Sequence, residues 1–305
     1  MIYALRHRTT YSYGAPVTFA RCVLRLTPSQ SASQTVLESQ IAVTPQPASA
    51  QDGVGAFGEH TRTVTIDVPH ETLIIEARSR VDVHAAPVGD PVNSYPWEVV
   101  RALAYESRAL GPEGPAAYLY PTRRTPAAPA ITDYARASFS PDRPIIAAAV
   151  HLMQRIRWDF VYDPEATTVS TPVQEVFKAR RGVCQDFAHL MISSLRGLGL
   201  PAAYVSGYLR TVPPPGKPRL EGADATHAWV SIWCGPDHGW IGFDPTNAML
   251  VQNDHIVLAV GRDYADVAPI DGIILAPGAQ TLEVEVDVIP EGDPLPQPRP
   301  ARAAG

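Results

Sequence analysis

Residues 180–190 read Arg-Arg-Gly-Val-Cys-Gln-Asp-Phe-Ala-His-Leu, and this stretch decides how the fold is interpreted. After Gly182 the pattern becomes helical, because the apolar residues three, four and seven positions beyond Cys184 share one helical face with it. Glycine is common just after the C-terminus of a helix. We therefore predict a helix that begins with Cys184 and ends at Gly197 or Gly199.

Cys184 would lie among unpaired backbone N–H groups and at the positive end of the helix dipole. Both favour the thiolate, which is the nucleophilic form of cysteine. The same residue also lies on the apolar face of the helix, where free cysteines are commonly buried as small hydrophobic side chains. The segment alone leaves both interpretations open, whereas Cys22 and Cys234 lie inside strand patterns and are expected to be structural.

A second segment, residues 226–247, favours the catalytic interpretation. His227 opens one predicted strand, and a short turn leads into a second strand that ends at Asp244. In an antiparallel hairpin the start of the first strand lies beside the end of the next, so these two side chains are expected to meet. A cysteine nucleophile needs a base, and the imidazole needs a carboxylate that fixes its tautomer. The candidate catalytic residues are therefore Cys184, His227 and Asp244.

Periodicity along the rest of the chain predicts the α+β class. Strand patterns separated by turn signals fill the first hundred residues and indicate an antiparallel sandwich or sheet. Helical periodicity begins at residue 145, and strand patterns return after residue 200. Prolines, of which the chain has 31, punctuate the region between. We predict a β-rich domain at 1–110, a proline-rich connector at 111–144, a catalytic core at 145–290 and a disordered tail at 291–305.

Composition excludes several classes of protein. The net charge of −6 and the pI near 5.8 leave no basic face for a nucleic acid. No stretch approaches the ~20 apolar residues that cross a bilayer, and the N-terminus lacks the apolar run of a signal peptide. Three cysteines without a CxxC pair do not form a disulfide framework. We expect a soluble, cytoplasmic protein with no nucleic-acid or membrane partner.

Metal-ligand spacing is also missing from the sequence. A zinc site would need to draw on scattered residues, because no CxxC, HxxxH or HExxH pair anchors one. We therefore predict neither a metal nor another cofactor, and we expect two further histidines near the candidate site to be packed or solvated, namely His189 and His238.

Three separated motifs together resemble the transglutaminase-like superfamily, namely Gly182–Ala188, His227–Val230 and Phe243–Asn247. They are most similar to bacterial proteins described as candidate cysteine proteases. The resemblance spans roughly residues 145–270, and the strand-rich residues 1–100 resemble the N-terminal region that precedes the core in those proteins. It implies a papain-like core in which the nucleophile helix packs on an antiparallel sheet. Cys184 would be the nucleophile, His227 the general base and acid, and Asp244 the residue that orients His227.

The resemblance implies acyl transfer from an amide or isopeptide bond of a peptide or protein. With water as the acceptor the enzyme is a protease or amidase, and with an amine it is a transglutaminase. Gln185 stands where animal transglutaminases have tryptophan, and the compact length leaves out their later β-barrels, so we favour hydrolysis. A non-catalytic binding module that retains the fold is the alternative from another class.

Other residues near the motifs are given secondary roles. The backbone N–H of Cys184 is one donor for an oxyanion hole, and a second could come from Trp158 or Tyr162, although we favour both as core aromatics. The proline-rich loop 212–218 could overhang the site or be an inert excursion. We expect three charged residues to lie on the surface, namely Arg180, Arg181 and Asp186.

Overall fold

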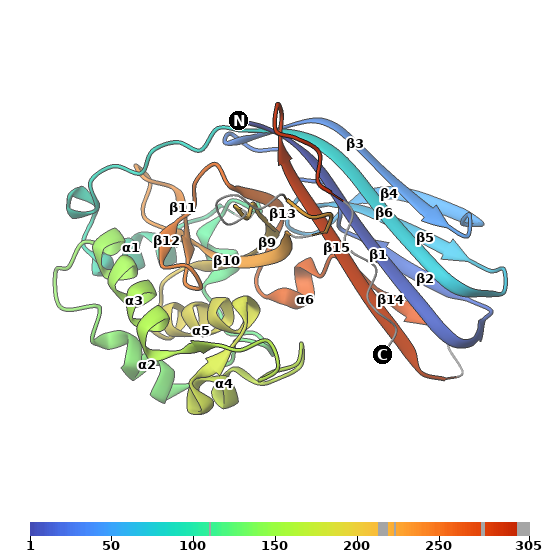
Figure 1. Cartoon of the computed structure of the whole chain (residues 1–305). Coiled ribbons are helices and arrows are strands. Elements are labelled where there is room, and N and C mark those ends of the chain that lie inside the picture. Colours follow the sequence, from blue (N-terminus) through green and yellow to red (C-terminus); the bar gives the residue numbers. More distant parts are fainter. Residues whose placement is uncertain (110, 213–218, 223, 276–277, 298–305) are drawn as a thin grey trace.

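The computed structural model describes residues 1–109, 111–212, 219–222, 224–275 and 278–297. The chain folds into a β-sandwich and a second lobe in which helices pack on a five-stranded sheet (Figure 1). The α+β class predicted from periodicity is confirmed. Within the described residues no helix is long and apolar enough to span a membrane.

The sandwich contains two four-stranded antiparallel sheets. Along the first strand, odd-numbered residues from Tyr3 to Thr9 are buried while Ala4 is exposed and Arg6 and Arg8 are half-buried, as expected for a sheet with one covered face. The first sheet has the order β15 (Gln280–Pro290), β1 (Ile2–Val17), β6 (His70–Val83) and β3 (Gln34–Thr44). The second has the order β14 (Ile270–Ile274), β2 (Ala20–Leu24), β5 (His60–Ile66) and β4 (Ser49–Val54).

Two strands from the C-terminal part of the chain complete this sandwich. β15 pairs with β1 over a long antiparallel register that runs from Tyr3 opposite Pro290 to Tyr13 opposite Gln280, and Figure 1 shows the two lying side by side. β14 pairs with β2. The domain boundaries predicted from sequence assign both strands to the catalytic core at 145–290. The structure instead places them in the N-terminal sandwich. The alternation of residues identifies a strand, whereas its partner depends on contacts far along the chain.

The second lobe is organised around one buried helix, α5 (Cys184–Gly197), whose residues from Gln185 to Arg196 are all buried. The predicted start at Cys184 is confirmed. α5 packs on an antiparallel sheet with the order β12 (Met249–Leu250), β11 (Trp240–Asp244), β10 (Ala225–Trp233), β9 (Ala202–Leu209) and β13 (His255–Gly261).

Further helices surround α5 (Figure 1). They are α1 (Trp97–Glu106), α2 (Pro129–Arg136), α3 (Ile145–Asp159), α4 (Val173–Ala179) and α6 (Tyr264–Val267), with single 3₁₀ turns at Pro91–Asn93 and Pro115–Tyr118. Two short strands, β7 (Val161–Tyr162) and β8 (Arg181–Gly182), pair in parallel just before α5. They bring the end of α3 next to the start of α5.

The proline-rich region predicted as a connector belongs to this lobe. α2 packs against α5, and Ile131, Ala135 and Phe139 are buried in the same hydrophobic core. Arg196 of α5 strengthens the connection, because its guanidinium donates to the carbonyl of Tyr118 at 2.9 Å. Proline density identifies where regular structure is interrupted, but it does not show whether the intervening helix is buried.

A shared apolar cluster joins the two lobes. Tyr3 and Leu5 of β1 pack with Tyr208 of β9 and Ile256 of β13. His7 is buried in the same interface, where its Nδ1 lies 2.8 Å from the hydroxyl of Tyr208. Burial lowers the pKa of His7 to about 4, so the imidazole is neutral near pH 7.

The predicted tail begins with ordered residues. The N–H of Glu291 donates to the carbonyl of Ile2, and the N–H of Gln297 donates to that of Arg219. The start of the tail therefore runs along the protein surface instead of leaving it at residue 291. The rest of the tail and most of the proline-rich loop, residues 213–218, lie outside the described residues.

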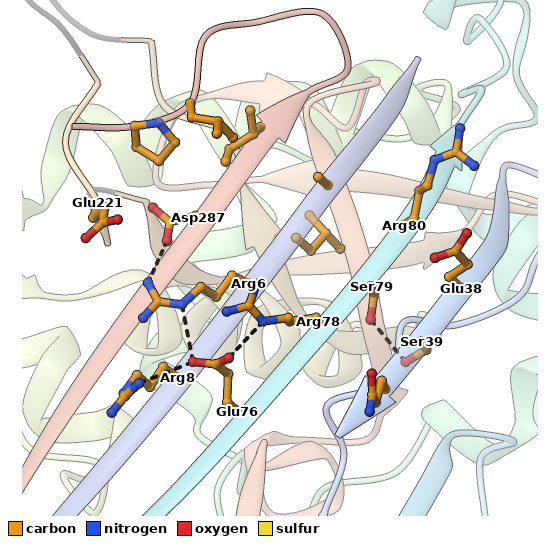
Figure 2. Close-up of a pocket in the computed structure, with 16 residues that line it drawn as sticks. Arg6, Arg8, Glu38, Ser39, Glu76, Arg78, Ser79, Arg80, Glu221 and Asp287 are labelled. Atoms are coloured by element: carbon orange, nitrogen blue, oxygen red, sulfur yellow. Dashed lines mark hydrogen bonds and ion pairs between the residues drawn. The ribbon is translucent and has the colours of Figure 1, made fainter. Parts of the chain in front are cut away.

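The solvent face of the first sheet carries a network of ion pairs around a shallow hollow of about 910 Å³ (Figure 2). Arg6 lies between two acceptors, Glu76 at 3.3 Å and Asp287 at 3.1 Å. Glu76 also accepts from Arg8 and Arg78. Within this network each arginine already has a carboxylate partner, which explains how a row of like charges can occupy neighbouring strands.

Candidate active site

The start of α5 is held by a buried carboxylate. Oδ2 of Asp186 accepts from the N–H of Val183 at 2.9 Å and from the hydroxyl of Thr167 at 2.6 Å. Burial raises the pKa of Asp186, and these two hydrogen bonds oppose the rise. The expectation that Asp186 is a surface charge is wrong, because its side chain caps the helix.

Gly182 makes room for this cap. A Cβ at Gly182 would lie 2.6 Å from Oδ2 of Asp186, which is closer than two such atoms can approach. The glycine before the cysteine therefore allows the Asp186 carboxylate to reach back over the helix start. Through this contact, Asp186 fixes the backbone on which Cys184 stands.

His227 lies on β10, directly opposite Gly207 of β9. A Cβ at Gly207 would lie 2.5 Å from the Cη2 atom of Trp229 and 2.1 Å from the carbonyl of Ile256. The missing side chain thus provides the space in which the buried indole of Trp229 packs beneath the candidate site. The ring of Trp229 lies 6.0 Å from that of His227, centroid to centroid.

The structure brings His227 and Asp244 together. Nε2 of His227 lies 2.8 Å from Oδ2 of Asp244, and the Asp244 side chain is completely buried. The β10–β11 register ends with Val230 opposite Phe243. His227 and Asp244 lie beyond that pair and are therefore diagonal rather than direct neighbours across the hairpin. Diagonal pairs are within reach of long or aromatic side chains, which is how the hairpin still joins them.

Several donors converge on the Asp244 carboxylate. Oδ1 accepts from the backbone N–H groups of Thr246 and Asn247, and Oδ2 accepts from the side-chain amide of Asn247 at 2.7 Å. Burial by itself would raise the pKa of Asp244, but hydrogen bonds from His227, His255 and Asn247 outweigh it and hold the pKa well below its usual range. The carboxylate is therefore ionised throughout the physiological range.

The half-buried Cys184 side chain interacts with the same imidazole. Burial would lower the pKa of His227, yet the interactions with Asp244 and Cys184 raise it to about 9. Because Nε2 faces Asp244, the nitrogen left for the thiol is Nδ1. The geometry therefore favours the imidazolium form of His227 near Cys184 at neutral pH.

A second histidine, His255, also contacts Asp244, and no signal in the sequence identifies it. Nε2 of His255 lies 3.3 Å from Oδ2 of Asp244, and the His255 side chain is completely buried. His255 opens β13, whose strand pattern is visible in the sequence, but β13 pairs with β9 and is not adjacent to β11. Only the assembled sheet brings the two residues together.

Potential metal ligands in the described ranges gather at this same point, at His227, Asp244 and His255, whose ligand atoms lie within 4.8 Å of one another. Both histidine Nε2 atoms are hydrogen bonded to the same carboxylate oxygen, at 2.8 and 3.3 Å. An ion would have to replace both contacts. We therefore interpret the three side chains as a hydrogen-bond network. His189 lies apart from it, with its ring tilted against that of Tyr204 at 5.0 Å between centroids.

Two aromatic residues differ from their expected core positions. Trp158 is 76% exposed at the end of α3, and Tyr162 is 52% exposed on β7. Tyr162 pairs in register with Gly182, two residues before Cys184. Burial raises the pKa of Tyr162, and the nearby Cys184 side chain adds to the rise. Of the two candidate oxyanion donors, Tyr162 is therefore the one beside the thiol.

Comparison with known proteins identifies two matching regions. Residues 3–82 match the bacterial transglutaminase-like N-terminal region, and residues 132–245 match the transglutaminase-like superfamily. An uncharacterized protein of Mycobacterium tuberculosis is 42% identical over 96% of this chain and 94% of its own length. A protein-glutamine gamma-glutamyltransferase of Pseudomonas aeruginosa is 31% identical over 49% of this chain but only 23% of its own length.

A solved structure supports the fold across both lobes. A protein from Cytophaga hutchinsonii, described as a candidate cysteine protease, superimposes with a TM-score of 0.73 and covers 97% of this chain and 93% of its own. Its sequence identity of 21% makes it a match of fold only. The sandwich and the helix–sheet lobe therefore occur together in another bacterial protein.

Proposed function

Because the chain belongs to the transglutaminase-like superfamily, we propose that it is a thiol-dependent enzyme acting on amide or isopeptide bonds through Cys184, His227 and Asp244. The observation that carries the proposal is the buried Asp244–His227 hydrogen bond of 2.8 Å beside a cysteine at a helix N-terminus. A merely structural cysteine has no need of an imidazole oriented by a carboxylate.

The reaction proceeds in two halves. The thiolate of Cys184 attacks the carbonyl carbon and forms a C–S bond, while the backbone N–H of Cys184 stabilises the oxyanion. The C–N bond then breaks as the imidazolium of His227 gives its Nδ1 proton to the leaving amine. In the second half, His227 removes a proton from the incoming nucleophile. That nucleophile attacks the thioester, and the C–S bond breaks with its electron pair leaving on sulfur, which restores the thiolate and the imidazolium.

Hydrolysis is the favoured outcome, with a peptide or protein amide as substrate, no cofactor and the cytoplasm as the site of action. The departure at Gln185 from the tryptophan of animal transglutaminases supports this choice. Transfer to an amine is the second candidate, and the similarity to the glutamyltransferase of P. aeruginosa supports it. The three residues would activate water and an amine alike, so the acceptor must be determined by experiment.

Iodoacetamide is expected to alkylate Cys184 selectively, at a rate that stays nearly level from neutral pH to about 9. Hydrogen bonds keep the His227 pKa near 9, so its positive charge supports the thiolate over that range. An unassisted thiol would instead react about ten times faster for each unit of pH below its own pKa. Cys22 and Cys234 are buried, and burial raises the pKa of both thiols.

Peptide mass spectrometry after timed labelling measures this selectivity, with Cys184→Ser as the control in which the fast label disappears. Equal labelling of all three cysteines, appearing only at high pH, would contradict an activated Cys184.

The activity itself is tested with a panel of peptides that contain glutamine or an isopeptide bond, incubated with and without a primary amine. We expect chain or isopeptide cleavage by the wild type, detected by mass spectrometry. An amine adduct on glutamine would instead select the transglutaminase branch, and deamidation alone would select an amidase of glutamine side chains. Products formed equally by a Cys184→Ala variant would contradict the proposed function.

A further inference from the structure

We propose that His255 is a positioning residue of the active site, which holds the Asp244 carboxylate aimed at His227. The inference rests on the proposed function, because it assigns His255 a role through that pair. Oδ2 of Asp244 is shared by the two imidazoles, at 2.8 Å from His227 and 3.3 Å from His255. His255 has no contact of its own with Cys184 among those described, so its role is indirect.

The tautomer of His255 is determined by its surroundings. Its Nδ1 accepts a hydrogen bond from the backbone N–H of Gln252 at 3.4 Å. A neutral imidazole carries one proton, so accepting at Nδ1 places that proton on Nε2, the atom that faces Asp244. The contact with Asp244 is therefore a donated N–H···O⁻ bond. It opposes protonation of the carboxylate, as does the amide of Asn247.

The ring of His255 is also held in place by packing. Trp229 meets it edge-on, with centroids 5.2 Å apart and planes at 78°. The space for that indole exists because Gly207 has no side chain. A histidine with both nitrogens occupied and one edge against tryptophan has little freedom to turn away, so it restricts the movement of Asp244 as well.

The electrostatic surroundings of His255 contain few other groups. Asp244 faces it from β11 and His227 from β10, with ring centroids of the two histidines 6.2 Å apart. The adjacent Asp254 is engaged elsewhere, by the hydroxyl of Tyr3 at 2.8 Å and by Arg210 at 3.4 Å. Asp244 is therefore the group whose position, and with it the hydrogen bond to His227, should respond when His255 is changed.

The expected effect has a definite sign. Without the Nε2–H donor, the Asp244 carboxylate loses one of the contacts that keep it facing His227, so its hydrogen bond to the imidazolium weakens. The pKa of His227, which that bond helps to raise to about 9, should then fall. The pH range over which Cys184 reactivity stays level should therefore end at a lower pH than in the wild type.

The test compares His255→Phe with His255→Gln by measuring the rate of Cys184 alkylation by iodoacetamide from pH 4 to pH 10. Phenylalanine fills the space without a donor, and glutamine can present an N–H near the position of Nε2. We expect the level range of the His255→Phe profile to end about one pH unit lower than that of the wild type, and His255→Gln to restore at least half of the shift. With a cleaved peptide as substrate, kcat should fall on the order of tenfold while KM is unchanged.

His7→Phe is the matched control. His7 is also buried, but it bonds to Tyr208 and Thr9 in the interface between the lobes. Its replacement should lower the urea midpoint without moving the pH at which the level range ends. If His255→Phe does not fold, His255→Leu removes the same donor with a smaller apolar side chain.

The outcomes separate the inference from the function on which it rests. Slow, unselective alkylation of wild-type Cys184 would overturn the proposed function itself. Fast wild-type alkylation with superimposable profiles for His255→Phe and wild type would overturn the role of His255 alone. A shift that His255→Gln does not reduce would also overturn it, because packing rather than the donated hydrogen bond would then be responsible.

Discussion

Replacement of Cys184 with alanine is expected to lower kcat on the peptide panel by on the order of 10⁶-fold, with the fold retained. The thiolate forms the only covalent bond between enzyme and acyl group, and no neighbouring side chain can replace it. The side chain is half-buried and contributes little volume to the core. The urea midpoint and the far-ultraviolet circular dichroism should therefore match those of the wild type.

Cys234→Ala is the matched control for this loss. Cys234 lies in the same lobe, is completely buried and donates its S–H to the carbonyl of Ile232. Removing it should reduce the free energy of unfolding by roughly 1–2 kcal/mol and leave kcat per folded molecule unchanged. Activity retained by Cys184→Ala would exclude thiol catalysis altogether.

Replacement of Asp244 with asparagine is expected to reduce kcat by on the order of 10²–10⁴-fold. The carboxylate accepts from both imidazoles and from Asn247, whereas an asparagine amide would present N–H groups to some of these donors. His227 can relieve the conflict by accepting at Nε2, which places its proton on Nδ1 toward Cys184. In that tautomer the ring cannot take a proton from the thiol.

The pH dependence of the Asp244→Asn variant is a second measurement of the loss of the carboxylate. Asp244 supports the imidazolium of His227, so without its charge the His227 pKa should fall from about 9 toward 6.5. The alkaline limb of activity should move to lower pH accordingly. Asp254→Asn is the control, because Asp254 bonds Tyr3 and Arg210 outside the site. A wild-type pH profile in Asp244→Asn would remove Asp244 from the mechanism.

The parts of the site that could be predicted from sequence are those determined by local structure. The start of α5 follows from a glycine and a helical apolar period within one short segment. The meeting of His227 and Asp244 follows from a hairpin whose strands are adjacent in the chain. The diagonal placement of His227 and Asp244 is harder to predict from sequence. It depends on the twist of the sheet and on the neighbouring strand β9, where Gly207 leaves space for Trp229.

The parts that could not be predicted depend on contacts between distant segments. Nothing near His255 distinguishes it from an ordinary strand residue, and it reaches Asp244 only because the chain crosses from one edge of the sheet to the other. Asp186 has the sequence context of an exposed charge on a helix. In the structure its carboxylate is buried and accepts hydrogen bonds from the Thr167 hydroxyl and the Val183 N–H. For α2, residues 131–139 allow a short helix among the prolines, but nothing in the sequence shows that α5 covers its apolar face.

The return of β15 to β1 has a consequence for biosynthesis. Tyr3 is translated before the whole second lobe, but its partner Pro290 is translated after it. Until then one edge of β1 has no strand to pair with, and an unpaired edge is a template for pairing with other chains. Closure of the sandwich must therefore be a late step, with the slow kinetics typical of long-range strand pairing. During that interval the nascent chain exposes an edge that favours aggregation.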